Sequence, residues 1–190
     1  MELQSRRCFV VGLGKSGVSA AKFCASRGAD VCGVDDKKPE DFSKELTQEL
    51  TDAGVKLHLG GKPRDELVAA DLIVISPGVP PCEEIDAART AGVKIVSEIE
   101  LASRYLEAPI VGITGTNGKS TVTSLIGEML SRSGRETFVG GNIGTPLIEA
   151  IGAPAGGPKG ALVVELSSFQ LEEVETFRPT IALLLNVTED

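Results

Sequence analysis

The segment Gly112–Thr121 contains the residue types needed to bind a nucleotide phosphate. It reads Gly-Ile-Thr-Gly-Thr-Asn-Gly-Lys-Ser-Thr, follows the apolar run 108–111 and precedes a helical pattern of apolar residues. In a strand–loop–helix arrangement, backbone N–H groups and the helix dipole attract an anion, Lys119 adds a positive charge, and the Ser120 hydroxyl can hold Mg²⁺. The segment therefore predicts a site for ATP or GTP.

The glycine spacing in this loop departs from the strict phosphate-loop pattern. That pattern, G-x-x-x-x-G-K-[ST], needs glycine at position 113, where Ile stands. The glycines are instead Gly112, Gly115 and Gly118. The alternative is a plain strand–turn–helix junction without a ligand. Such a junction needs one or two glycines, and not three followed by Lys-Ser-Thr.

A second glycine-rich turn lies near the start of the chain. Gly12, Gly14 and Gly17 form the pattern G-x-G-x-x-G between an apolar strand and a helix, and the acidic pair Asp35 and Asp36 follows about twenty residues later. This is a Rossmann fingerprint, in which pyrophosphate lies at the helix N-terminus and an acid binds a ribose hydroxyl. Three interpretations stay open: a dinucleotide, another nucleotide held by the same turn, or glycines that only permit the turn.

Three further residues follow predicted strands and are candidates for the same chemistry. Glu165 ends the apolar run 161–164, where a carboxylate can hold Mg²⁺ directly or through water, unless it is only a surface acid. Asn142 could bind phosphate or substrate, or could only form a left-handed turn. Gly78 follows the run 72–75 at the sheet edge where ligands of open α/β sheets bind, although a rigid Pro-Gly turn also explains it.

Strand-like and helix-like segments alternate along the whole chain, which predicts an α/β fold with parallel sheets. We expect a Rossmann-like parallel-sheet domain at residues 1–107 and a P-loop α/β domain at residues 108–190, which ends straight after an apolar strand and looks truncated. Residues 152–160, rich in glycine and proline, predict a mobile surface loop. The expected strands are 8–11, 30–34, 55–59, 72–75, 93–96, 137–139, 161–164 and 181–185, and the expected helices include 16–27, 40–53, 83–91, 97–106 and one between 139 and 161.

Composition excludes several classes of function. The chain carries 19 Lys and Arg against 27 Asp and Glu, a net charge of −8, which disfavours nucleic-acid binding. No apolar stretch is long enough to span a membrane, and no signal-peptide core follows Met1. The four cysteines show no C-x-x-C spacing, and His58 has no partners for a catalytic triad. We expect a cytoplasmic protein with reduced thiols, a structural His58, and neither a nucleic-acid nor a membrane partner.

Four segments together resemble motifs of the Mur ligase family, and in particular of its D-glutamate-adding members. They are the phosphate loop 114–120, the Gly-Gly-Asn-Ile-Gly turn 140–144, the segment 165–172 (Glu-Leu-Ser-Ser-Phe-Gln-Leu-Glu) and the segment 186–190 (Asn-Val-Thr-Glu-Asp). The phosphate loop resembles the family's loop in its irregular glycine spacing too. The resemblance extends over essentially the whole chain.

The resemblance implies an ATP-dependent ligase of peptidoglycan synthesis that adds D-glutamate to UDP-N-acetylmuramoyl-L-alanine through an acyl phosphate. The implied catalytic residues are Lys119, Glu165 and Asn142, with Mg²⁺ held by Ser120 and Glu165. The implied ATP contacts are Gly115, Thr116, Asn117, Gly118, Lys119, Ser120 and Thr121. The implied contacts with the UDP-linked substrate are Gly14, Lys15, Ser16, Asp35, Asp36, Lys37, Gly78, Asn142 and Ser167. Lys37 stands where the family often has Arg, so the planar fork of a guanidinium is replaced by a point charge.

The family's remaining machinery is not found in these 190 residues. It comprises a His soon after the segment 186–190, a modified Lys, and a third domain that binds D-glutamate. We therefore expect these residues alone to bind the UDP-linked substrate without turnover, and the intact protein to be a monomer. The strand near 181–185 should leave an exposed apolar edge that tends to associate. The competing hypotheses are an NAD-dependent oxidoreductase and a non-catalytic nucleotide-binding module.

Overall fold

The computed structural model describes residues 1–188, and the chain forms two compact units that divide between Glu98 and Ile99. This division lies earlier than the expected boundary between 107 and 108. The difference arises because helix α5 (Glu98–Ser103) is tied to the second unit. The Glu100 carboxylate in α5 accepts hydrogen bonds from the backbone N–H groups of residues 175–177.

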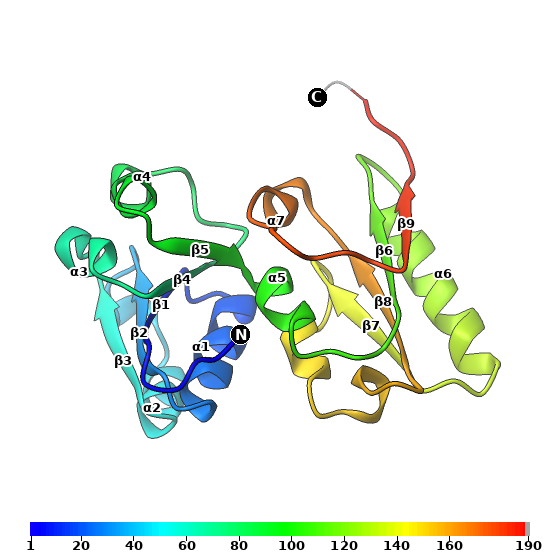
Figure 1. Ribbon diagram of the computed structural model, residues 1–190, viewed down its shortest axis with the longest axis horizontal. Helices are drawn as coiled ribbons and strands as arrows, with labels where there is room; N and C mark the ends of the chain where they lie inside the picture. Colours follow the sequence, from blue (N-terminus) through cyan, green and yellow to red (C-terminus); the bar gives the residue numbers. More distant parts are fainter. Residues whose placement is uncertain (189–190) are drawn as a thin grey trace. The chain divides into compact units, whose positions relative to one another are not determined.

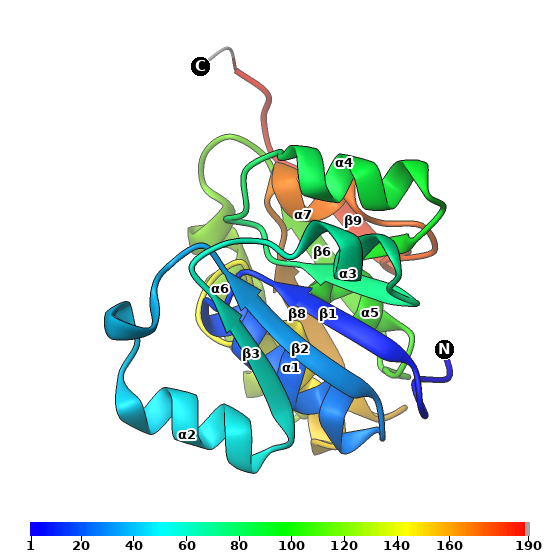
Figure 2. The same cartoon turned by 90° about the vertical axis from the view of Figure 1, so that its left-hand side faces the viewer.

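The first unit is built on a five-stranded, all-parallel sheet with the strand order β3-β2-β1-β4-β5 (Figures 1 and 2). The strands β2 and β3 lie on one side of β1 and the strands β4 and β5 on the other, so the strand order reverses between β1 and β4. Ligands of such sheets bind at this point, beyond the carboxyl ends of the strands. The strands are β1 (Arg7–Val11), β2 (Asp30–Asp35), β3 (Val55–Leu59), β4 (Leu72–Ile75) and β5 (Lys94–Ser97).

Helices cover both faces of this sheet, because its strands are apolar on both sides. Leu67 of α3 and Ile85 of α4 join Phe9 and Ile73 in one buried apolar cluster. α1 packs on the opposite face, toward which the buried side chain of Val10 points, since alternate strand residues face opposite sides. The helices are α1 (Lys15–Ser26), α2 (Lys44–Asp52), α3 (Arg64–Val68) and α4 (Glu83–Thr90).

Two helices of the first unit differ from expectation. The helix expected over 40–53 begins only at Lys44, because the Ser43 side chain caps it by accepting the N–H of Leu46 at 3.2 Å. Pro39–Asp41 forms a separate 3₁₀ turn, η1. The five-residue α3 was not predicted, since one turn of helix is too short to show a period.

The second unit is built on a four-stranded, all-parallel sheet with the strand order β7-β8-β6-β9. Its helices are the end of α5, α6 (Lys119–Arg132) and α7 (Ser168–Glu172). β8 is an interior strand and is fully buried, so Glu165 at its end lies inside the unit. The strands are β6 (Ile110–Thr114), β7 (Thr137–Gly141), β8 (Ala161–Glu165) and β9 (Ile181–Leu184).

The helix expected between 139 and 161 is absent from this described stretch. Two 3₁₀ turns, η2 (Leu147–Ala150) and η3 (Pro154–Gly156), occupy it. A helix that began at Leu147 could not continue through Pro154, which lacks the N–H that an interior helical position donates. The expectation of a surface loop over 152–160 is partly wrong. Ala155 is buried, and the carbonyl of Gly156 accepts the N–H groups of two residues that precede β6.

The expectation of an exposed apolar edge at β9 is confirmed. Ile181 and Leu184 expose 53% and 66% of their surface, and β9 ends the strand order of its sheet (Figure 1). The tendency to associate stays a prediction. Within residues 1–188, no helix combines the length and the apolar character needed to cross a membrane.

Candidate functional site

The turn between β1 and α1 requires glycine at positions 12 and 17. Gly12 has φ +88°, a backbone conformation that side chains disfavour. At Gly17, an added Cβ would lie 1.8 Å from the carbonyl oxygen of Gly12, so only glycine lets the helix approach the strand. This fits the predicted role of the turn, which is to bring the start of α1 close to a ligand.

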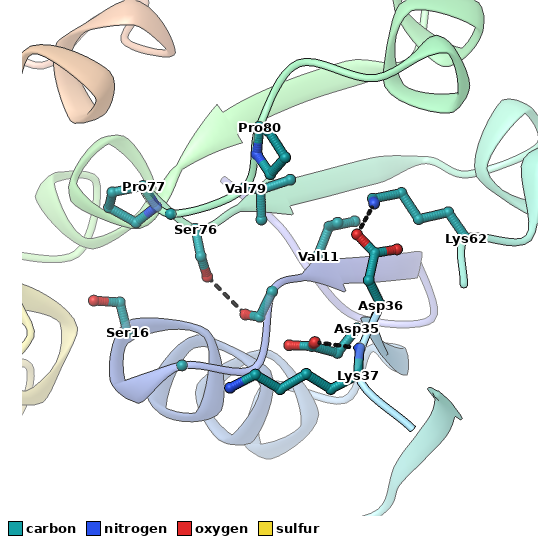
Figure 3. Close-up of a pocket in the computed structure, with 13 residues that line it drawn as sticks. Val11, Ser16, Asp35, Asp36, Lys37, Lys62, Ser76, Pro77, Val79 and Pro80 are labelled. Carbon is teal, nitrogen blue, oxygen red and sulfur yellow. Dashed lines mark hydrogen bonds and ion pairs between the residues drawn. The ribbon is translucent and has the colours of Figure 1, made fainter. Parts of the chain in front are cut away.

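A cavity of about 380 Å³ lies at this turn, beyond the carboxyl ends of the first unit's strands (Figure 3). The loop after β4 closes one side, and its Ser76 hydroxyl donates a hydrogen bond to the Gly12 carbonyl at 2.7 Å. The structure therefore brings together most of the residues expected to contact the UDP-linked substrate. Those that line the cavity are Gly14, Ser16, Asp35, Asp36, Lys37 and Gly78.

Asp35 supports the glycine turn from the end of β2. Its Oδ2 accepts the N–H of Leu13 at 2.7 Å, and its Oδ1 accepts the N–H of Lys37 at 3.0 Å. The expected role was a direct contact with the ligand. The hydrogen bonds assign Asp35 a structural role in the turn as well, and its contact with the ligand stays a prediction.

Lys62 lines the same cavity and was missed by the sequence analysis. Its side chain is only 7% exposed and forms an ion pair with Asp36, which is 58% exposed (Figure 3). Burial lowers the pKa of the Lys62 ammonium, but the hydrogen bond and charge of Asp36 outweigh burial and raise the pKa. Lys62 therefore stays protonated and can meet a phosphate or a uracil carbonyl. The signal that could have identified it is the Gly60-Gly61-Lys62 turn directly after β3.

In the second unit, the predicted phosphate loop lies between β6 and α6. Gly115 and Gly118 have φ +142° and +84°, values that favour glycine, and α6 begins directly after Gly118. The Lys119 ammonium donates to the carbonyl oxygens of Gly115 at 2.7 Å and Thr116 at 3.0 Å. The lysine thus lies folded over the loop, and the start of α6 presents the N–H groups that no helical carbonyl accepts.

The carboxylate of Glu165 lies at the end of β8 and joins two other predicted residues. Its Oε2 accepts the hydroxyl of Ser120 at 2.7 Å, and its Oε1 accepts the side-chain amide of Asn142 at 2.9 Å. Gly141, with φ +99°, allows this approach, because an added Cβ there would lie 2.4 Å from the Glu165 carbonyl oxygen. Glu165 is 2% exposed, so the two donors compensate for a largely desolvated charge.

A wide cavity of about 580 Å³ opens beside this loop. Lys119, Asn142 and Ser167 all line it, so the structure brings the predicted phosphate, catalytic and substrate contacts to one place. Ser167 also caps α7, where its hydroxyl oxygen accepts the N–H of Gln170 at 3.3 Å. A role for Ser167 in binding substrate stays a prediction.

His58 lies in β3, paired in register with Val34, which fits the structural role expected of it. In the described residues, no group of three or more His, Cys, Asp or Glu side chains is arranged to hold a metal ion. A metal ion held by the side-chain oxygens of Ser120 and Glu165 would therefore need further ligands from a bound phosphate, an arrangement that is usual for Mg²⁺.

The fold and these two sites define an α/β protein with a Rossmann-type glycine turn in one unit and a loop of the phosphate-binding type in the next. Comparison with known families is consistent with this class. Residues 6–97 match the model of the Mur ligase MurD-like N-terminal domain, and residues 113–190 match that of the Mur ligase middle domain. The chain belongs to the Mur ligase family, which confirms the resemblance noted in its motifs.

Curated relatives carry a more specific name. The chain is 50% identical over 191 aligned residues to the UDP-N-acetylmuramoylalanine–D-glutamate ligase of Geobacter sp. (strain M21), and 48% identical over 192 to that of Desulfatibacillum aliphaticivorans. Each alignment covers 100% of this chain and 42% of the relative, so the chain spans about two fifths of their length.

A solved structure, the pseudomurein peptide ligase type C from Methanothermus fervidus, is similar in fold. The TM-score is 0.50 with 24% sequence identity, over 98% of this chain and 39% of that one. The likeness agrees with the α/β architecture. The family assignment leaves the NAD-dependent oxidoreductase without support.

Proposed function

We propose that the protein is an ATP-dependent ligase that adds D-glutamate to UDP-N-acetylmuramoyl-L-alanine in peptidoglycan synthesis. The observation that carries this proposal is the pair of hydrogen bonds from Ser120 and Asn142 to the buried Glu165, close to a cavity that Asn142 and Lys119 line. The names of the curated relatives support the choice of D-glutamate.

The donor set at the phosphate loop fits Mg²⁺. Ser120 Oγ and Glu165 Oε2 are both oxygens, they lie 2.7 Å apart, and the carboxylate is charged and buried. Magnesium prefers one or two carboxylates together with substrate phosphates. Ser120 and Glu165 would hold the ion, which would neutralise phosphate charge that otherwise repels an attacking carboxylate.

The proposed reaction has two steps on the substrates. The carboxylate of the alanyl group attacks the γ-phosphorus of ATP, and the bond from the γ-phosphorus to the bridging oxygen breaks, so that ADP leaves. The amine of D-glutamate then attacks the carbonyl carbon of the acyl phosphate, loses a proton, and expels inorganic phosphate. Lys119 and the N–H groups at the start of α6 would stabilise the charge that develops on the transferred phosphate.

The first unit has the features needed to bind the UDP end of the substrate. Its cavity is lined by the glycine turn and the start of α1, where a diphosphate could bind, and Lys37 and Lys62 add positively charged side chains to the lining. Asp35 and Asp36 offer acceptors for ribose hydroxyls or for the uracil N–H. This binding role is part of the proposal.

The test is product formation by the intact protein. Phosphate release should require ATP, Mg²⁺, UDP-N-acetylmuramoyl-L-alanine and D-glutamate together, and the product should gain the mass of one glutamate residue. Omission of D-glutamate should leave an acyl phosphate that hydroxylamine traps. ATP binding without any product under these conditions would favour the non-catalytic module instead.

A further inference from the structure

The segment that follows β9 runs along the phosphate loop and continues the pairing of β9 with β6. The N–H of Leu185 donates to the carbonyl of Thr114 at 3.0 Å, and the N–H of Thr116 donates to the carbonyl of Asn186 at 3.1 Å. The ladder between the two strands thus extends past their ends into the loop itself. Figure 1 shows β9 beside β6 in the same sheet.

The side-chain amide of Asn186 closes this ladder on a single residue of the loop. Its Oδ1 accepts the N–H of Asn117 at 2.8 Å, and its Nδ2 donates to the carbonyl of Asn117 at 3.0 Å. One amide therefore fixes the peptide groups on both sides of Asn117. A carboxylate can satisfy only the N–H, and an apolar side chain neither.

The close approach of the two segments is also visible at Gly115. An added Cβ at this position would lie 3.1 Å from both the backbone nitrogen and the carbonyl oxygen of Asn186. Glycine at 115 therefore serves the contact with Asn186 as well as the positive φ of +142°.

We infer that Asn186 is a positioning residue that sets the conformation of the phosphate loop before ATP binds. The inference rests on the proposed function, because it assumes that the loop binds ATP. The backbone N–H groups of Thr116 and Asn117 are bonded to Asn186, so phosphate oxygens are left with the N–H groups at the start of α6. The sequence analysis expected Thr116 and Asn117 to contact ATP. In this structure their backbone N–H groups hold the loop in place, and a contact of either residue with ATP stays a prediction.

The same contacts act on Lys119. Its ammonium donates to the carbonyls of Gly115 and Thr116. These carbonyls belong to the two peptide groups whose N–H is bonded to Asn186. If the 115–117 backbone turns, these carbonyls move and the lysine loses its anchor. Asn186 thus controls the placement of the positive charge without touching the phosphate.

Two substitutions in the intact protein test this role. Asn186→Ala removes both side-chain bonds, and Asn186→Asp keeps the acceptor for the Asn117 N–H but places a charge against the Asn117 carbonyl and the phosphates. We expect the Michaelis constant for ATP to rise about tenfold in Asn186→Ala and further in Asn186→Asp. The Michaelis constant for the UDP-linked substrate should not change. Gln48→Ala, which removes a matched amide bonded to Asp52 on exposed α2, is the control and should match wild type.

Hydrogen exchange supplies a measurement that does not depend on ATP. Without nucleotide, the peptide 114–118 should exchange faster in both Asn186 variants than in wild type, while a peptide over β8 keeps its protection. If the peptide 114–118 exchanges at the wild-type rate in both variants, the inference is overturned, even if their Michaelis constants for ATP have changed. If the wild-type protein binds no ATP, the proposed function fails, and the exchange result still decides whether Asn186 orders the loop.

Discussion

The hydroxyl of Ser120 donates a hydrogen bond to the carboxylate of Glu165 at 2.7 Å, although the two residues are 45 positions apart in the sequence. The bond joins the first turn of α6 to the end of the central strand β8. It places a hydroxyl and a carboxylate where a phosphate-bound Mg²⁺ would need them.

Glu165→Gln should lower turnover of the intact protein about 100-fold or more, because the amide cannot supply the charge that the metal needs. The Gln side chain can still bond Ser120 and Asn142, so the melting temperature should change little. Steady-state phosphate release, measured over a range of Mg²⁺ concentrations, checks this. Glu128→Gln on the exposed face of α6 is the control. Turnover of Glu165→Gln near that of the control would contradict a metal role for Glu165.

Lys119→Ala should weaken ATP binding by roughly 1.5–3 kcal/mol, which is about 10- to 150-fold, because a charge-assisted phosphate contact is removed. The loss in rate should be larger, since charge develops on the phosphate in the transition state. Calorimetry with ATP and single-turnover kinetics separate the two effects. The exposed Lys159→Ala serves as the matched control. Near-normal turnover of Lys119→Ala would remove Lys119 from the mechanism.

Lys62→Met should weaken binding of the UDP-linked substrate roughly tenfold, because a buried ammonium at the cavity is lost while the apolar stem is kept. Calorimetry with the substrate measures this, and ATP affinity should stay unchanged. Lys44→Met, at the exposed start of α2, tests the effect of charge alone. Equal affinities of the two variants would show that Lys62 only pairs with Asp36.

Glu100 should make the second unit sensitive to acid. Burial raises the pKa of its carboxyl, but hydrogen bonds from the Thr176 hydroxyl and from three backbone N–H groups outweigh burial and lower the pKa from 4.5 to about 2. The folded state therefore favours the ionised form. This contribution, roughly 3 kcal/mol, is fully present above pH 4.5 and is lost as the pH falls toward 2.

Glu100→Gln removes this pH dependence, since the amide does not titrate. The wild type should be more stable at neutral pH, and the difference in unfolding free energy should shrink as the pH falls from about 5 to about 2. Urea unfolding at several pH values measures the difference. A constant difference over this range would mean that the Glu100 hydrogen bonds do not depend on its charge.

The exposed edge at β9 should make a polypeptide of residues 1–190 self-associate. Sedimentation velocity should detect species larger than the monomer, and Ile181→Lys should reduce them because charged side chains protect sheet edges. Leu125→Lys, on the exposed face of α6, tests the helix surface separately. A monomeric wild-type polypeptide at high concentration would refute the prediction.

Much of the fold could be predicted because its signals are local. The strands 55–59 and 72–75 have the predicted bounds. The second is a short apolar run, which is typical of a buried parallel strand, and the first alternates apolar residues with Lys56 and His58. Two expectations about helices were wrong. The helix expected between 139 and 161 is replaced by two 3₁₀ turns, with Pro154 in the middle of the expected helix, and the short α3 was not predicted.

The sequence by itself determined the two glycine turns, because a positive φ is a local property that favours glycine. It also determined the family, because four motifs occur in the family's order. Only the tertiary structure decided the partners of the polar groups. Glu165 meets Ser120 and Asn142 because β8 lies between β6 and β7, and Asn186 reaches Asn117 because β9 lies beside β6. Strand order brings such residues together, and the local sequence of a single strand does not determine its place in the sheet.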